Sequence, residues 1–273
     1  MIYQRSTGYT GGIALSALTP VLLWAAPVQA QPAIVLPFAP PNTPLLFETV
    51  TERSIRGQLI RHRVQRQVQF TRVNDGYAIE CHIVTQTIDG PEPVVKLMEI
   101  STKALENQTF RFHIGRDGSA LRATDFPGSW QLISDGIDRL LADDGPALSP
   151  MARAARAMMA RQLKGMAEVD RQAIVLNEVV PILAWAGRPV AAGVSDGVAG
   201  STRIDQVRQE QGQLLITQSA RSGEVSGTTS ILSEIRVSMG TGLVESLQSQ
   251  TVTDDGHSQR AVHTSLRLIK WPD

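Results

Sequence analysis

Cysteine is almost absent from this chain of 273 residues, which contains only Cys81. A single cysteine cannot form an intramolecular disulfide, so the fold must be held together by its own core. Cys81 also lies far from the predicted processing site described below, which excludes a lipid-modified N-terminal cysteine. It follows Glu80 and precedes His82 in sequence typical of a strand, where adjacent side chains point to opposite faces. Cys81 and His82 therefore cannot act as a nucleophile and its base, and we expect a buried, unreactive thiol.

Net charge is also absent, because 26 Lys and Arg residues balance 26 Asp and Glu residues. A neutral chain offers no electrostatic reason to bind nucleic acid. The sequence contains no glycine-rich phosphate loop of the Walker or dinucleotide type. No two histidines have the spacing of metal ligands, although distant strands could still bring some of them together. The sequence therefore predicts no cofactor and no metal among its five histidines, which are His62, His82, His113, His257 and His263.

Residues 1–30 have the pattern of a cleavable secretory signal peptide. One positive charge precedes an apolar run of 14 residues, 13–26, and small or compact residues follow at the positions that a signal peptidase reads. A membrane-spanning helix would need about 20 apolar residues. This run is shorter and contains Pro20, so cleavage between Ala30 and Gln31 is favoured over a membrane anchor. No later segment is apolar enough to span a membrane.

An exported chain of this size without a disulfide is typical of a bacterial periplasm or the cell exterior. Residues 31–44 are rich in proline and predict an extended linker, either solvated or laid along a surface. The remaining residues, 45–273, predict one antiparallel-sheet domain. Polar and apolar residues alternate before and after a helical block at about 128–186. The expected fold class is α+β, with a large curved antiparallel sheet and the helical block packed on one face.

Two short segments mark this layout. Gly128-Ser129-Trp130 stands at the start of the helical block, and Thr241-Gly242-Leu243-Val244 stands between two of the later strands. With them, the order of elements resembles an uncharacterised family of exported bacterial proteins, whose layout resembles the curved half-barrel of periplasmic lipoprotein carriers. The resemblance covers most of residues 45–270. It implies no catalytic residue.

One motif suggests hydrolysis. Gly193-Val194-Ser195-Asp196-Gly197 matches the G-x-S-x-G of a serine-hydrolase nucleophile elbow, which needs a strand before the serine and a helix after it. Neither flank fits, because Arg188-Pro189 precede the motif and Val198-Ala199-Gly200-Ser201 follow it. We therefore expect a flexible glycine-rich connection and a protein that is not an enzyme. A cryptic serine hydrolase using Ser195 remains an alternative.

A curled sheet covered by helices contains either a filled core or a cleft. The residues expected to face that space are Phe70, Ile79, Phe110, Phe112, Trp130, Ile133, Ile137, Met158 and Met159. Because all are apolar, a ligand there would be a lipid or another apolar molecule held mainly by burial. The sequence thus favours a periplasmic binder or carrier of apolar ligands. A structural or interaction protein of the cell envelope is the alternative, and no protein partner is predicted.

Overall fold

The computed structural model describes most of the chain between residues 33 and 270. The described residues are 33–55, 57–92, 94–95, 98, 105–106, 108–142, 150–193, 195–196, 201–224, 227–254, 256 and 258–270. By its internal contacts the chain forms two units, Met1–Ala30 and Gln31–Asp273, and all described residues belong to the second. The predicted signal peptide and its cleavage site between Ala30 and Gln31 lie outside the described residues.

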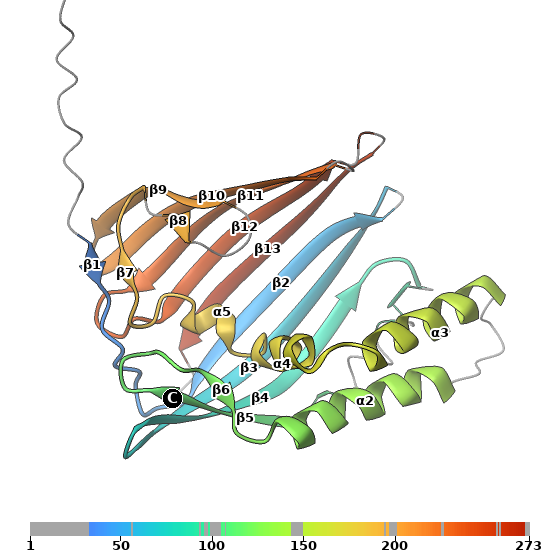
Figure 1. Ribbon diagram of the computed structural model, residues 1–273, viewed down its shortest axis with the longest axis horizontal. Coiled ribbons are helices and arrows are strands. Elements are labelled where there is room, and N and C mark those ends of the chain that lie inside the picture. Colours follow the sequence, from blue (N-terminus) through green and yellow to red (C-terminus); the bar gives the residue numbers. More distant parts are fainter. Residues whose placement is uncertain are drawn as a thin grey trace, which may run out of the picture. The chain divides into compact units, whose positions relative to one another are not determined.

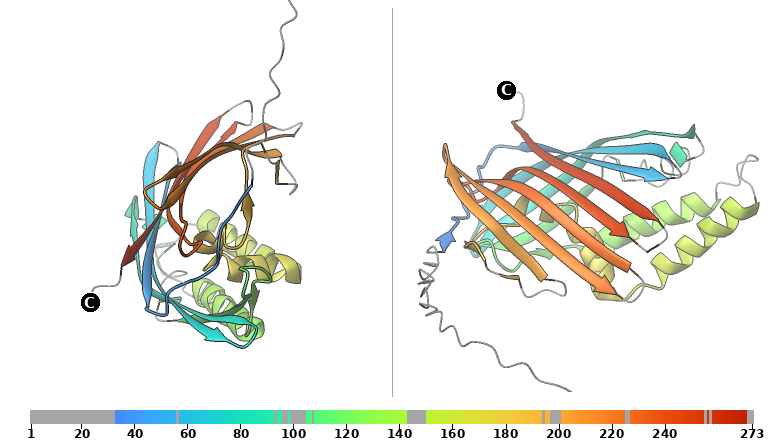
Figure 2. Two further views of the ribbon diagram at one scale, coloured as in Figure 1. Left: turned by 90° about the vertical axis from the view of Figure 1, so that its left-hand side faces the viewer. Right: turned by 90° about the horizontal axis from the view of Figure 1, so that it is seen from above.

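An open antiparallel sheet of eleven strands forms most of the domain (Figure 1). Its spatial order is β6-β5-β4-β3-β2-β13-β12-β11-β10-β9-β8. The strands are β2 (Leu45–Ile55), β3 (Gln58–Val73), β4 (Gly76–Asp89), β5 (Thr109–Gly115), β6 (Arg122–Ala123), β8 (Ser195–Asp196), β9 (Ser201–Glu210), β10 (Gln213–Glu224), β11 (Gly227–Ser238), β12 (Val244–Asp254) and β13 (Gln259–Lys270). The sheet curls strongly about its concave face (Figure 2). The predicted curved antiparallel sheet is therefore confirmed.

The sheet consists of two halves that meet at one pair of strands. β2 to β6 come from the first part of the chain, and β8 to β13 come from the last part. The halves join through β2 and β13, whose register runs from Leu45 opposite Lys270 to Arg53 opposite Val262. Every other long strand pairs with its neighbour in sequence, as expected of hairpins.

The predicted helical block is also confirmed. It contains α2 (Phe126–Ala142), α3 (Pro150–Lys164), α4 (Glu168–Leu176) and α5 (Val180–Leu183). The chain turns between α4 and α5, and Pro181 lies in the first turn of α5, where its missing N–H costs nothing. α4 and α5 lie over the concave face of the sheet, whereas α2 and α3 lie side by side next to it (Figure 1). None of the described helices combines the length and apolar character needed to cross a membrane.

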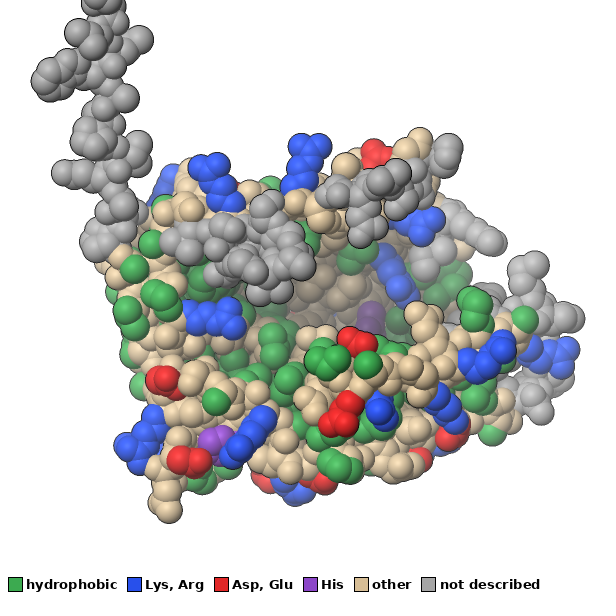
Figure 3. Space-filling model, in the orientation of Figure 1, with side chains coloured by type: hydrophobic (Ala, Val, Ile, Leu, Met, Phe, Trp, Pro, Cys, Tyr) green, Lys and Arg blue, Asp and Glu red, His purple; other side chains and the backbone are tan. Residues whose placement is uncertain are grey.

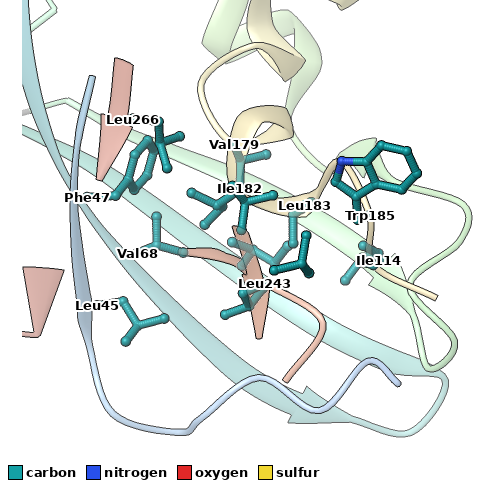
Figure 4. Packing of buried hydrophobic residues seen from close by; sticks show 14 of the residues in the cluster. Leu45, Phe47, Val68, Ile114, Val179, Ile182, Leu183, Trp185, Leu243 and Leu266 are labelled. Atoms are coloured by element: carbon teal, nitrogen blue, oxygen red, sulfur yellow. The ribbon is translucent and has the colours of Figure 1, made fainter. Parts of the chain in front are cut away.

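The hydrophobic core fills one end of the concave face. Alternate residues of the long strands point toward the helices, because side chains of a strand alternate between its two faces. Phe47 and Val68 from the first half of the sheet and Leu266 from the second half belong to one buried cluster with Val179 and Ile182 of the α4–α5 region (Figure 4). The core therefore joins both halves of the sheet to the helices.

The proline-rich segment belongs to the folded domain and is not a solvated linker. Its residues 33–44, called the N-terminal strap below, run extended, and β1 (Ile34–Val35) pairs with β7 (Pro189–Val190). Leu36 and Phe38 are only 1% and 8% exposed. The Phe38 ring packs edge-on against Phe70 and Tyr77. Of the two placements that the sequence left open, the strap takes the second, and burial of its apolar residues extends the domain before β2.

The second marker segment, Thr241-Gly242-Leu243-Val244, is where the strap crosses the turn between β11 and β12. The Ala39 N–H donates to the carbonyl of Thr241 over 3.1 Å. Gly242 has a φ of +74°, and a Cβ at this position would overlap the carbonyl oxygen of Pro37. Only glycine tolerates both conditions. The glycine of this segment is thus explained by close backbone packing and not by a catalytic or binding role.

Candidate functional site

The four strand residues that were predicted to line a cleft lie in the filled core. Phe70, Ile79, Phe110 and Phe112 are at most 1% exposed. Phe70 lies opposite Ile79, and Ile79 lies opposite Phe112, on three adjacent strands. These side chains pack on one another and on the helices, so they leave no room for a ligand. These residues therefore fill this end of the concave face and do not line a cleft.

The predicted residues of α2 pack at the border of the core. Ile137 is buried, and Trp130 and Ile133 are partly buried against the core cluster. The guanidinium of Arg171, from α4, lies over the Trp130 ring at 5.6 Å from its centroid. Trp130 therefore links α2 to α4 and does not face an open space.

The prediction that Met158 faces inward is wrong, because its side chain is 63% exposed. Helix α3 buries a stripe that contains Ala160 and is flanked by the partly buried Ala157 and Leu163, three residues to either side. Met158 falls outside this stripe. Ala160 lies in the packed face of α3, where its small side chain lets a neighbouring element approach closely. The side chain of Met159 is outside the described part of the structure.

Away from the core, a row of polar side chains crosses the concave face. Its members occupy directly paired positions on six adjacent strands, from β3 to β10. We call it the polar row; it consists of His62, Thr51, Thr264, Ser249, Ser233 and Gln218. Most of these side chains are short, so they fill little of the space inside the curled sheet. Figure 3 shows a hollow here between sheet and helices, with a histidine on its floor.

Apolar side chains flank the polar row on both sides. The row nearer the core includes Val64, Leu266 and Ile235, which are buried, and Leu247, which is partly exposed. The row on the other side includes the partly exposed Val262, Ile231 and Ala220. These two sets differ from the core proper because several members still contact solvent. The hollow therefore has a largely apolar surface on either side of the polar row, interrupted by Thr49 in one flanking row and by Arg53 and Thr251 in the other.

His62 is the one histidine of the concave face among the described residues. Its Nε2 lies 3.2 Å from Oε1 of Gln86 on β4. Burial lowers the pKa of His62, and the guanidinium groups of Arg66 and Arg53 lower it further, against the hydrogen bond to Gln86. At neutral pH the ring is thus uncharged and offers one donor and one acceptor.

A largely buried ion pair lies between the sheet and the helical region. Nε of Arg66, on β3, lies 2.7 Å from Oε2 of Glu178, in the turn between α4 and α5. Both side chains are largely buried, at 12% and 17% exposed. Arg66 also donates to the Thr49 hydroxyl over 2.8 Å and lies above the Phe47 ring. These contacts attach the helical region to the sheet, and sequence reasoning missed them because the partners are far apart in the chain.

Cys81 is fully buried, as predicted, with its Sγ 3.5 Å from the carbonyl oxygen of Glu178. Burial raises its pKa above the ordinary range of a thiol, so the thiolate needed for nucleophilic attack is disfavoured. His82 is on the opposite face of the sheet, 3.3 Å from the Thr109 hydroxyl. His113 is also on that face and pairs with Asp75. The predicted separation of Cys81 from His82 is confirmed.

Ser195 lies in the two-residue edge strand β8, where it is paired with Arg203. The residue after it, Asp196, continues this strand, whereas a nucleophile elbow needs a helix there. Gly193 precedes it in a turn, and Val194 and Gly197 are outside the described residues. Among the described residues, no three of His, Cys, Asp and Glu come together in the way that metal ligands do.

A second depression lies on the outer face of the sheet, opposite the helices. It has a volume of about 480 Å³ and crosses β2, β13, β12, β11 and β10. Most of its lining side chains occupy the alternate positions that point away from the core, including Glu52, Glu234 and His263. Leu232 is 56% exposed in it. The predicted cleft residues take no part in this groove.

No family model and no curated protein matches the chain. Among solved structures, the chain is similar to one described as lipid-protein interactions in lipovitellin, with 7% identity, a TM-score of 0.39, and coverage of 84% of this chain and 25% of that chain. It thus spans about a quarter of that chain's length. It is also similar to an outer membrane lipoprotein-sorting protein domain from Vibrio parahaemolyticus, with 5% identity, a TM-score of 0.21, and coverage of 85% and 88%. Membership of an exported bacterial family stays a prediction.

Proposed function

We propose that this protein is an exported, non-catalytic binder or carrier of apolar ligands, and that the ligand lies in the hollow of the concave face. One observation carries the proposal. Leu247, Val262 and Ile231 point into the concave side of a curled sheet but remain partly exposed, whereas a filled core would bury them. A ligand that covers them gains about 0.8 kcal/mol for each methylene group that leaves water.

A bulky side chain in the hollow is expected to block binding. Thr264 is in the middle of the polar row, on the strand that joins the two halves of the sheet. We expect Thr264→Trp to reduce the affinity for Nile red, a neutral apolar dye, at least tenfold, because the indole occupies the space of the ligand. The measurement is a fluorescence titration of the purified protein.

The matched control is Ser265→Trp, one residue further along β13. Its side chain points to the outer face, because neighbouring residues of a strand alternate, so dye binding should stay unchanged. Far-ultraviolet circular dichroism shows whether both variants are folded. Unchanged dye binding in folded Thr264→Trp, or no binding by the parent protein, would contradict the proposal.

Export is part of the proposal. We expect the mature chain to begin at Gln31, because the sequence around Ala30 has the features that a signal peptidase reads. The first residues of the strap, which begins at residue 33, would then follow closely on the new N-terminus. Sequencing of the N-terminus of protein recovered from a bacterial periplasm checks this. Recovered protein that still begins at Met1 would refute it.

The alternative, an interaction protein of the cell envelope, is favoured by the groove on the outer face. The groove is long, and Leu232 offers an exposed apolar contact within it. The two functions use opposite faces, so Leu232→Asp distinguishes them. This variant should retain dye binding if the ligand lies in the hollow. It should lose envelope association, measured by co-sedimentation with membranes, if the outer face is the functional one.

A further inference from the structure

Three hydrogen-bonding side chains of the polar row have no partner among the described residues: Thr51, Thr264 and Gln218. The other members are paired. The Ser233 hydroxyl donates to that of Ser249 over 2.9 Å, and His62 contacts Gln86. All three unpaired side chains are partly exposed on the concave face, so water satisfies them when no ligand is bound.

These side chains restrict what can fill the hollow. A pure hydrocarbon would displace the water and leave the two hydroxyls and the amide without partners. Each buried polar group without a hydrogen bond loses its hydration without compensation, which offsets much of the gain from apolar burial. A ligand that carries hydrogen-bond acceptors at the same places avoids this cost. The hollow therefore selects against molecules that lack polar groups.

The spacing of the row indicates which acceptors fit. Thr51 and Thr264 are directly opposite each other on β2 and β13. The Cβ atoms of such a pair are about 5 Å apart. Gln218 lies three strands beyond Thr264, at about 14 Å from the strand spacing. The two hydroxyls thus suit a pair of neighbouring carbonyl oxygens, and the apolar rows on both sides suit hydrocarbon chains.

We propose that the ligand is an amphipathic acyl ester or amide with two neighbouring carbonyl groups. Thr51 and Thr264 donate their hydroxyl hydrogens to these carbonyls, and the acyl chains cover Leu247, Val262 and Ile231. This inference rests on the proposed function and goes beyond it, because apolar binding alone would make no use of the polar row.

The test removes the two hydroxyls without changing the size of the side chains. Thr51→Val combined with Thr264→Val keeps the shape of the hollow, and Thr85→Val combined with Thr217→Val is the matched change on the outer face. Competition against bound Nile red measures the affinities for two ligands, dioctanoylglycerol and hexadecane. We expect the first double variant to bind dioctanoylglycerol at least about tenfold more weakly and hexadecane equally well or better. The outer-face double variant should bind both ligands with the affinities of the parent protein.

The outcomes separate this inference from the proposed function. Suppose that Thr264→Trp loses dye binding, but that the folded double variant Thr51→Val with Thr264→Val binds dioctanoylglycerol as tightly as the parent protein. This result overturns the inference and leaves the proposed function standing. A parent protein that binds no dye overturns both. If the double variant does not fold, the parent protein alone decides. It should prefer dioctanoylglycerol to hexadecane, and equal or reversed affinities would refute the inference.

Discussion

Replacing Arg66 by methionine is expected to lower the free energy of unfolding by about 3 kcal/mol. The substitution leaves the Glu178 carboxylate in a largely buried site without its counter-charge 2.7 Å away. It also removes the donor to the Thr49 hydroxyl and the cation above the Phe47 ring. Breaking one side of a buried ion pair costs more than the pair itself contributes, because the remaining charge stays desolvated. Urea denaturation followed by circular dichroism measures the change.

An exposed ion pair on the same strand provides the control. Nη2 of Arg61 lies 2.6 Å from Oε1 of Glu52, and both side chains are considerably more exposed than those of the buried pair. Arg61→Met should therefore cost less than about 1 kcal/mol. A double variant, Arg66→Met with Glu178→Gln, should recover part of the loss, because no charge is then buried alone. Equal losses for Arg66→Met and Arg61→Met would show that the buried pair does not hold the helices to the sheet.

Truncation of Phe70 should lower the free energy of unfolding as much as Arg66→Met does, or more. Phe70→Ala is expected to cost about 3–5 kcal/mol, the range for a fully buried phenylalanine. The ring is 0% exposed and packs edge-on against Phe38 of the N-terminal strap. The substitution leaves a cavity between β3, β4 and the strap, so the strap should also become more accessible. Thermal unfolding and proteolysis within residues 33–44 report the two effects.

The comparison for Phe70 is Met158, which the sequence had placed in the same cleft. Its exposed side chain predicts that Met158→Ala changes the free energy of unfolding by no more than about 0.5 kcal/mol. A small loss in Phe70→Ala would mean that this end of the concave face is an open cleft after all. A large loss in Met158→Ala would mean that α3 buries the methionine against another surface.

The fold was largely predictable because local patterns specify it. Alternation along strands such as 64–71 and turns such as Asn74-Asp75-Gly76 depend on neighbouring residues only. The order of strands, helices and strands then leaves few arrangements of layers. The burial of Cys81 followed from its parity with Ile79 and Ile83. The burial of the strap could not be predicted, because a proline-rich segment has the same sequence pattern whether it is solvated or packed on a surface.

The candidate site was predicted less well because it depends on registers between distant strands. Thr51, Thr264 and Gln218 are ordinary strand residues in sequence, and only the pairing of β2 with β13 aligns them. Met158 was misplaced because periodicity alone does not decide which stripe of α3 faces its neighbour. One signal was available: small hydroxyl residues at positions that continue an apolar face, such as Thr49 and Thr51 after Phe47.

The pairing of β2 with β13 also determines when the sheet can form. β2 is the first long strand in chain order and β13 is the last, so more than 200 residues separate partners such as Leu45 and Lys270. The two halves can fold early as sets of hairpins, but the hydrogen-bonded edge between them stays open until β13 has been synthesised. Contacts this far apart in sequence make folding slow. During synthesis β2 therefore stays an unpaired edge of the first half-sheet for a long interval, and a chaperone could cover it.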